Sequence, residues 1–202
     1  MTPVKAKAVK KKTATSIKPQ AVATGDMSVL MKKLGVDNAL ALPRLVKVVV
    51  NAGVGRVRKD EKKLEAAKRD LAIITGQKPA ERLAKKSISS FSLREGDVVG
   101  LVVTLRGSRM HDFLRRLISV ALPRTRDFRG LGLRGFDGSG NYTLGVKEHT
   151  VFAEINPELT PHVFGLEISL VTTAADNNAA TLLFEALGVP IQKDQAANEP
   201  KG

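Results

Sequence analysis

The sequence of 202 residues contains no cysteine, no tryptophan and only one tyrosine. Without cysteine the chain can form no disulfide, no thiolate nucleophile and no cysteine-ligated zinc site. Its longest apolar run, residues 98–105, is far shorter than the roughly 20 residues that a membrane-spanning helix needs. We therefore expect neither a membrane partner nor a disulfide-stapled domain, and a reducing compartment is the simplest setting.

Positive charge, in contrast, is abundant. The chain has 33 Lys and Arg against 20 Asp and Glu, which gives a formal net charge of +13 and a pI of about 10.2. Hydrophobic residues make up 43% of the sequence, which is normal for a protein with a folded core. A folded and strongly basic chain favours a polyanionic partner, and nucleic acid is the leading candidate.

The charge pattern divides the chain into three parts. Residues 1–25 contain six lysines and no acid, which predicts a disordered Lys-rich arm. This arm is either a solubilising tail or a polyelectrolyte that follows phosphates. Residues 26–191 are expected to form a single domain, and residues 192–202 a polar C-terminal tail.

Helix and strand patterns mix within the domain. Periodicity and stop signals predict helices over 27–34, 60–75, 108–121 (capped by Ser108 and ended by Pro123) and 176–187. Strands are predicted over 45–51, 98–106, 141–147, 151–155 and 163–173, and residues 79–91 are expected to hold a strand, a loop and the start of another strand. Because strands joined by short links cluster late in the chain, we expect an α+β fold: a mainly antiparallel sheet with helices on one face.

Alternation within the strands predicts that the other face of the sheet is polar. Strand 98–106 has apolar residues at every second position, while Thr104 and Arg106 point the other way. Strand 45–51 places Lys47 and Asn51 opposite a row made of Val46, Val48 and Val50. Such polar side chains can bind phosphate, ribose hydroxyls and base edges. The alternative is a face that is simply solvated.

Residues 51–58 (NAGVGRVR) resemble a dinucleotide-binding fingerprint, but Arg58 stands where the third glycine is needed. The turn with Arg56, Arg58 and Lys59 therefore indicates either an anion site or an ordinary tight turn. The histidines at 111, 149 and 162 lack metal-ligand spacing and are expected at the surface or on helices. With no nucleophile motif and no carboxylate pair, we expect no enzyme, no catalytic residue, no metal and no cofactor.

Six segments in order resemble one protein family. They are 51–55 (NAGVG), 74–79 (ITGQKP), 103–107 (VTLRG), 123–131 (PRTRDFRGL), 136–146 (FDGSGNYTLGV) and 172–174 (TTA). Together they resemble the universal large-subunit ribosomal protein number five family, the carriers of 5S ribosomal RNA. The resemblance covers about residues 30–190. It implies a sheet with helices on one face and an open face for RNA, in agreement with the alternation.

The resemblance also implies sites. Contacts to 5S ribosomal RNA would fall on Asn51, Gly53, Gly55, Gln77, Lys78, Thr104 and Arg106. A loop towards the peptidyl-site (P-site) transfer RNA would include Lys85, Lys86, Ser87 and Phe91. A bridge loop towards the small-subunit head would include Arg124, Arg126, Arg129, Arg134, Asp137 and Asn141.

The implied partners are 5S ribosomal RNA, large-subunit ribosomal RNA, P-site tRNA, a protein of the small-subunit head and neighbouring proteins of the central protuberance. The implied place is the ribosome in the cytoplasm, with a bacterial and an organellar ribosome both left open. The alternative function is another basic architectural nucleic-acid-binding protein, which would prefer duplex DNA.

Overall fold

The computed structural model describes residues 27–36, 38–126 and 128–192. The expected arm (1–25) and residues 193–202 of the expected tail lie outside these ranges. The described chain contains one five-stranded sheet with the order β2-β3-β1-β5-β4. All neighbouring strands are antiparallel. Their bounds are β1 Leu45–Gly53, β2 Ala80–Leu83, β3 Val98–Leu105, β4 Tyr142–Val146 and β5 Leu166–Thr172.

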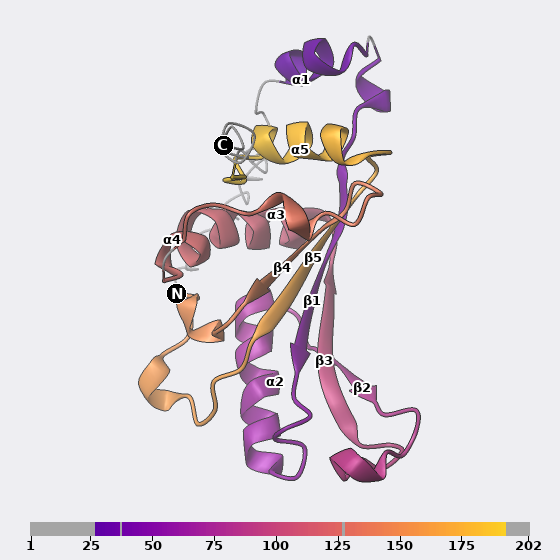
Figure 1. Ribbon diagram of the computed structural model, residues 1–202. Coiled ribbons are helices and arrows are strands. Elements are labelled where there is room, and N and C mark those ends of the chain that lie inside the picture. Colours follow the sequence, from indigo (N-terminus) through magenta and orange to yellow (C-terminus); the bar gives the residue numbers. More distant parts are fainter. Residues whose placement is uncertain (1–26, 37, 127, 193–202) are drawn as a thin grey trace, which may run out of the picture.

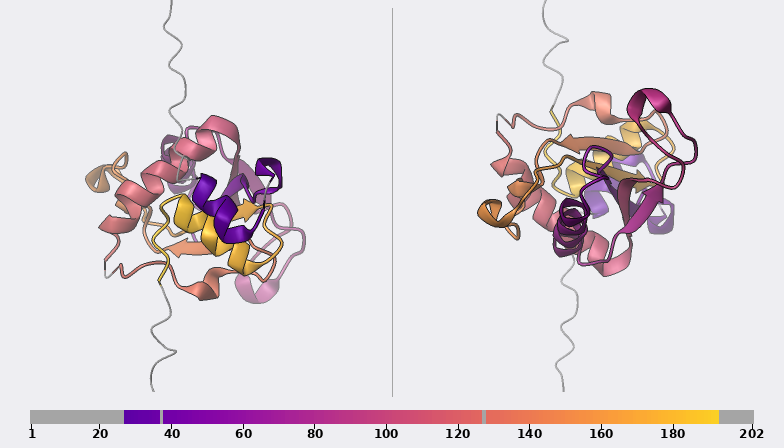
Figure 2. Two further views of the ribbon diagram at one scale, coloured as in Figure 1. Left: turned by 90° about the horizontal axis from the view of Figure 1, so that it is seen from above. Right: turned by 90° about the horizontal axis from the view of Figure 1, so that it is seen from below.

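Helices cover one side of this sheet. Figure 1 shows α2 (Glu61–Thr75) and α3 (Gly107–Arg116) on the same side, with α5 (Asn177–Ala186) at the upper end. The first helix, α1 (Met27–Leu34), packs on α5 (Figure 2). The α+β fold with helices on one face is therefore confirmed. Short 3-10 helices lie at Ala39–Ala41, Ser89–Phe91, Leu133–Gly135, His149–Val151 and Pro157–Leu159.

Local signals explain the limits of α2. The side chain of Asp60 accepts a hydrogen bond from the backbone N–H of Lys63, which satisfies a donor of the first turn. Gly76 follows the helix with φ +68°, a left-handed conformation that glycine adopts without strain. Between these ends, the stripe of α2 that faces the sheet is buried, as its periodicity predicts: Leu64, Ala67, Leu71 and Ile74.

The strands alternate as expected, with one exception. Buried side chains occupy every second position of β1 (Val48, Val50, Ala52), β3 (Leu101, Val103, Leu105), β4 (Tyr142, Leu144, Val146) and β5 (Leu166, Ile168, Leu170). Val46, which was expected to share the buried face, is exposed. The pairing between β1 and β5 shifts register between Leu45 and Lys47, and this irregularity breaks the alternation.

The predicted strand over 151–155 is wrong. The 3-10 helix His149–Val151 is followed by turns in which the N–H of Phe152 binds the carbonyl of His149 and the N–H of Ile155 binds that of Phe152. Phe152 and Ile155 are both buried and lie three residues apart, which is a helical spacing. A strand would have placed them on opposite faces.

The predicted helix 108–121 differs at both ends. Helix α3 begins at Gly107, so its N-cap residue is Arg106 and not Ser108, and Arg106 makes no side-chain capping bond. The chain continues through a π-helical turn, Leu117–Ala121, into a short helix α4, Leu122–Arg124. Pro123 therefore does not end the helix, because it lies in the first turn of α4, where its missing N–H is not needed.

His149 begins the 3-10 helix His149–Val151, so the helical alternative of its prediction is met, but its side chain is fully buried. Its ring stacks on Phe164, with 3.9 Å between ring centroids, and its Nδ1 accepts a hydrogen bond from the backbone N–H of Phe164. The other ring nitrogen, Nε2, lies 3.5 Å from Oδ2 of Asp70 on α2. The imidazole thus joins the segment before β5 to the helix that covers the sheet.

We expect stability to fall as the pH drops below about 6.5. Burial lowers the pKa of His149 below its ordinary value of 6.5, although the carboxylate of Asp70 opposes this shift. The unfolded chain then binds the proton more readily than the folded chain, so acid favours unfolding between pH 6.5 and the lower folded pKa. Urea unfolding at pH 7.5 and 5.5 measures this loss, and His149→Gln should remove most of it. A gain of stability at pH 5.5 would show that attraction to Asp70 outweighs burial.

Candidate nucleic-acid interface

The face of the sheet turned away from α2 and α3 carries polar side chains in rows across the strands. In one row, Thr104 of β3 pairs with Val49 of β1. The row continues through Ser169 of β5 to Thr143 of β4, whose hydroxyl lies 3.1 Å from that of Ser169. Thr104 is exposed and makes no side-chain hydrogen bond to another described residue, so its hydroxyl is available to a partner.

The next row is centred on Asn51. This residue pairs with Val102 on one side and with Glu167 on the other. Its Nδ2 donates a hydrogen bond to Oε2 of Glu167 at 3.2 Å. This bond orients the amide and leaves Oδ1 and one N–H of Asn51 for a partner. Glu167 also places an acid on a face whose other side chains are basic or neutral. The alternation within strand 163–173 predicts this acid, whereas the net charge of the chain gives no sign of it.

Glycine and arginine stand at the two ends of this face. Gly53 ends β1, and a Cβ at this position would meet no heavy atom within 4 Å. At Gly55, in the turn after β1, the nearest such atom is the carbonyl oxygen of Val99 at 3.9 Å. Packing within the described chain therefore does not require either glycine, whereas close approach of a partner would. Arg106 is exposed beyond the other end, directly after β3.

Gln77 and Lys78 lie just before the edge strand β2. The backbone of Gln77 is tied to Thr75, whose hydroxyl binds the carbonyl oxygens of Leu71 and Gln77. Lys78 is exposed. Ala80, two residues later, pairs with Val102 in the row of Asn51. The structure thus brings the seven expected 5S contacts to one face and its borders.

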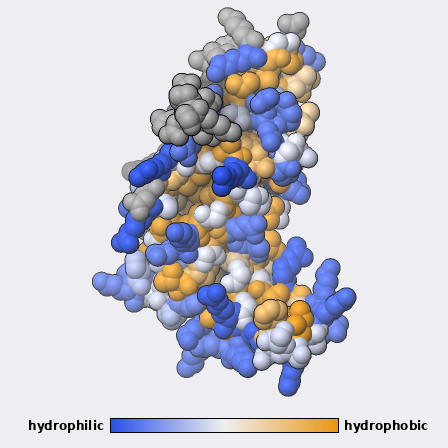
Figure 3. Space-filling view, in the orientation of Figure 1, coloured by the Kyte–Doolittle hydropathy of each residue, from blue (hydrophilic) through white to orange (hydrophobic). Residues whose placement is uncertain are grey.

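The expected tRNA-contacting loop protrudes from the lower end of the sheet. Lys85, Lys86, Ser87 and Phe91 are all exposed, and 71% of Phe91 is accessible. The Ser87 hydroxyl accepts a hydrogen bond from the backbone N–H of Glu95, so this residue also shapes the loop. Figure 3 shows hydrophobic and neutral side chains ringed by hydrophilic ones at this end of the molecule.

One arginine, Arg58, joins this loop to the turn after β1. Its Nη1 donates to the carbonyl oxygen of Gly55 at 2.8 Å, and its Nη2 donates to those of Phe91 and Ser92 at 2.9 and 2.6 Å. Its Nε lies 3.3 Å from Oδ2 of Asp97. The sequence marks Arg58 as the residue that breaks a nucleotide fingerprint and as part of a basic turn that is either an anion site or an ordinary tight turn. Its partners 33 and 34 residues away could not be inferred from that motif.

We expect Arg58→Ala to loosen the loop while the sheet stays folded. The variant loses charged hydrogen bonds to two loop carbonyls, each worth about 1.5–3 kcal/mol. Amide hydrogen exchange at Ile88, Ser92 and Leu93 should accelerate by about tenfold or more. Lys59→Ala is the matched control, because Lys59 is an exposed neighbour. Equal exchange in the two variants would remove Arg58 from this role.

The expected bridge loop combines exposed cations with a structural turn. Arg124, Arg126, Arg129 and Arg134 are exposed. Asp137 is different: its carboxylate accepts bonds from the Asn141 side chain and from the backbone N–H groups of Ser139 and Asn141, and these bonds lower its pKa. Asn141 in turn accepts a bond from the N–H of Thr172. Asp137 and Asn141 therefore hold the turn in place next to β5, which sequence reasoning did not anticipate.

Two features are absent from the described ranges. Among these residues there is no group of three or more His, Cys, Asp or Glu side chains that could hold a metal ion. Within the same ranges, no helix is both long and apolar enough to span a membrane.

Comparison with known proteins identifies the family. Residues 38–94 match the ribosomal protein L5 family, and residues 98–191 match the ribosomal L5 family C-terminus. The large ribosomal subunit protein uL5 of Rubrobacter xylanophilus is 53% identical over 163 residues, which cover 81% of this chain and 91% of the relative.

The protein of the same name from Dichelobacter nodosus is 50% identical over 163 residues, again 81% of this chain and 91% of the relative. The one from Thermus aquaticus is 48% identical over 186 residues, or 92% of this chain and 97% of the relative. With both family regions matched in order and identities near one half over most of the chain, this protein belongs to the ribosomal protein L5 family of the large ribosomal subunit.

Proposed function

We propose that this structural, non-enzymatic ribosomal protein binds 5S ribosomal RNA through the open face of its sheet. The observation that carries the proposal is the gathering of Asn51, Thr104 and Arg106 on or beside one uncovered face, with Gly53 at its end. Exposed donors and unhindered glycine backbone suit a folded RNA, which proteins recognise through phosphates, ribose hydroxyls and unpaired bases. The excess of basic residues supplies the salt-dependent part of the affinity.

Two further contacts belong to the same proposal. The protruding loop with Lys85, Lys86, Ser87 and Phe91 would approach P-site tRNA, because its two lysines are exposed cations that can meet phosphate groups. The arginines of the bridge loop would reach a protein of the small-subunit head. The arm before residue 26 would follow nearby ribosomal RNA. Neighbouring proteins of the central protuberance would also contact this protein.

The relatives point to the compartment. Each is a large ribosomal subunit protein of a bacterium, and bacterial ribosomes are cytoplasmic. The protein is therefore a cytoplasmic protein of the ribosome.

Competition between 5S ribosomal RNA and duplex DNA tests the proposal. We expect RNA to win, and affinity for it to fall steeply with salt. Arg106→Ala should weaken RNA binding by about 1–3 kcal/mol if its guanidinium binds phosphate or a base edge. Arg69→Ala is the charge-matched control, because Arg69 is exposed on α2, on the helix-covered side. Preference for DNA would favour the architectural alternative, and equal loss in both variants would remove Arg106 from the interface.

A further inference from the structure

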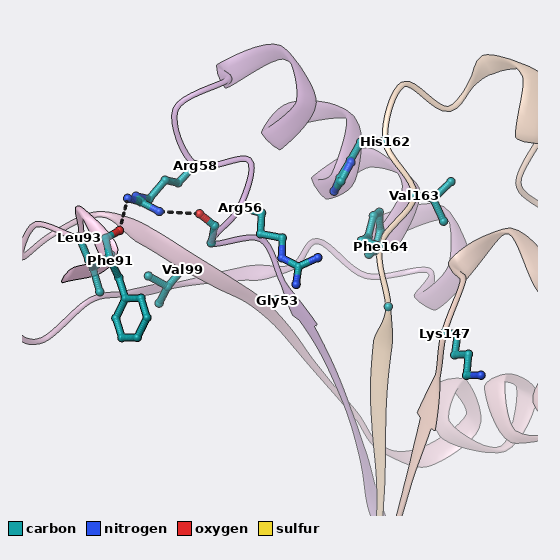
Figure 4. Close-up of a pocket in the computed structure, with 12 residues that line it drawn as sticks. Gly53, Arg56, Arg58, Phe91, Leu93, Val99, Lys147, His162, Val163 and Phe164 are labelled. Atoms are coloured by element: carbon teal, nitrogen blue, oxygen red, sulfur yellow. Dashed lines mark hydrogen bonds between the residues drawn. The ribbon is translucent and has the colours of Figure 1, made fainter. Parts of the chain in front are cut away.

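A groove lies at the lower end of the sheet, where β1 ends and β5 begins. Four segments line it: the turn after β1, the 91–93 part of the loop, the residue after β4, and residues 162–165 before β5. Its volume is about 780 Å³, within the range of small-molecule sites. Figure 4 shows Phe91 and Arg58 on one side, Arg56 near the middle, and Lys147 and Phe164 on the other side.

The charge of the groove is positive. Arg56 lines the groove from the turn after β1, and Lys147 lines it from the position directly after β4. Both side chains are exposed. Neither makes an ion pair or a side-chain hydrogen bond with another described residue. Arg58 and His162 add nitrogen groups, and the lining contains no Asp or Glu. Two unpaired cations that flank one cavity without a neutralising acid are suited to a phosphate group.

The rest of the lining is apolar or without side chains. Leu93, Val99 and Phe164 contribute hydrocarbon, and Phe91 presents a largely exposed ring. The backbone that carries this ring is held beside the groove, because Arg58 donates a hydrogen bond to the carbonyl oxygen of Phe91. Gly53 leaves its part of the wall open, since a Cβ there would meet nothing within 4 Å. Cations, an exposed aromatic ring and an open glycine wall match the parts of a nucleotide: its phosphate and its base.

We infer that this groove binds one unpaired ribonucleotide of the RNA that lies on the open face. Its phosphate lies between Arg56 and Lys147, and its base stacks on Phe91. The inference rests on the proposed function, because the groove continues the face at Gly53. It adds Arg56 and Lys147 to the residues expected to contact 5S ribosomal RNA. It also gives Phe91 a stacking partner on the side of the loop that faces the sheet. An RNA duplex cannot insert a base into the groove, because its bases are already stacked and paired.

Affinity for 5S ribosomal RNA, measured at several salt concentrations, tests the phosphate contact. Arg56→Ala and Lys147→Ala should each reduce the slope of log K against log salt by about 1, the value for one lost phosphate contact. Arg69→Ala, with the same change of charge on α2, should leave the slope unchanged. Equal slopes in all three variants would overturn the phosphate contact.

A single-stranded adenosine pentanucleotide and a 12-base-pair RNA duplex test the base contact. Phe91→Ala should weaken binding of the pentanucleotide by roughly 5- to 150-fold, the range for loss of one stacked base, with little change for the duplex. Ile88→Ala is the control, because Ile88 is an exposed apolar residue of the same loop outside the groove. Equal losses for both probes, or in both variants, would overturn the stacking.

The two proposals fail in different ways. If wild-type protein binds 5S ribosomal RNA and Arg106→Ala weakens it, but the Arg56, Lys147 and Phe91 variants behave as their controls, the groove is excluded and the proposed function stands. If wild-type protein shows no preference for 5S ribosomal RNA over duplex DNA, the proposed function itself fails.

Discussion

Thr104→Glu is expected to weaken binding of 5S ribosomal RNA by at least about 100-fold. Thr104 is exposed near the middle of the open face, in the row that contains Ser169 and Thr143. A carboxylate there would face the phosphates of a bound RNA, and like charges brought together across an interface cost several kcal/mol. Because the side chain makes no hydrogen bond within the described chain, the fold should tolerate the change. Filter binding at fixed salt measures the effect.

Two variants control for this experiment. Ile73→Glu adds the same charge on α2 at a position that is 47% exposed on the helix-covered side, and it should change affinity little. Thr104→Gln adds similar bulk without charge and should lose far less than the glutamate variant. If Thr104→Glu and Ile73→Glu weaken binding equally, RNA responds to net charge alone and the open face is not the binding surface.

Gly140→Ala is expected to reduce the free energy of unfolding by about 2–5 kcal/mol. Gly140 has φ +77°, where a residue with a Cβ is strained by about 1–2 kcal/mol. The added Cβ would also lie 2.8 Å from both the Cβ and the carbonyl oxygen of Ala174. Relieving this overlap means moving backbone in a packed region, at a further cost of about 1–3 kcal/mol. Urea unfolding followed by circular dichroism measures the loss.

Gly138→Ala separates the two contributions. Gly138 has φ +89° but would bring its Cβ within 4 Å of nothing, so this variant carries only the backbone strain of about 1–2 kcal/mol. The difference between the variants is then the cost of the contact with Ala174. Equal losses of unfolding free energy in the two variants would mean that the turn moves away from Ala174 at no cost. We do not expect this, because hydrogen bonds tie Gly140 to Thr172 and Asn177.

The fold was largely predictable because local patterns agree with tertiary packing. The stripe of α2 and the alternation in β3 and β5 each identify the buried side correctly. The errors occur where tertiary contacts override a local pattern. Residues 151–155 look like a strand but form turns that bury both Phe152 and Ile155. Pro123 looks like a stop, yet it lies in the first turn of the short helix Leu122–Arg124, which follows a π-helical turn.

The candidate site was predictable only in part. Alternation places Thr104 and Asn51 on the polar face, and the family resemblance adds the loops. The contacts of Arg58 and the grouping of Arg56 with Lys147 depend on segments far apart in the chain, which no short motif encodes. The burial of His149 was not predicted for a related reason: it depends on Phe164 and Asp70, which lie in other segments of the chain.

The order of the strands has a consequence for synthesis of the protein. The central strand β1 is paired on one edge by β5, and the bond between Asn51 and Glu167 closes a sequence separation of 116 residues. Contacts of this range form late, because the intervening chain must first be made and ordered. A growing polypeptide therefore keeps one edge of β1 vacant until β5 has been synthesised, and the open face of the sheet is incomplete until then.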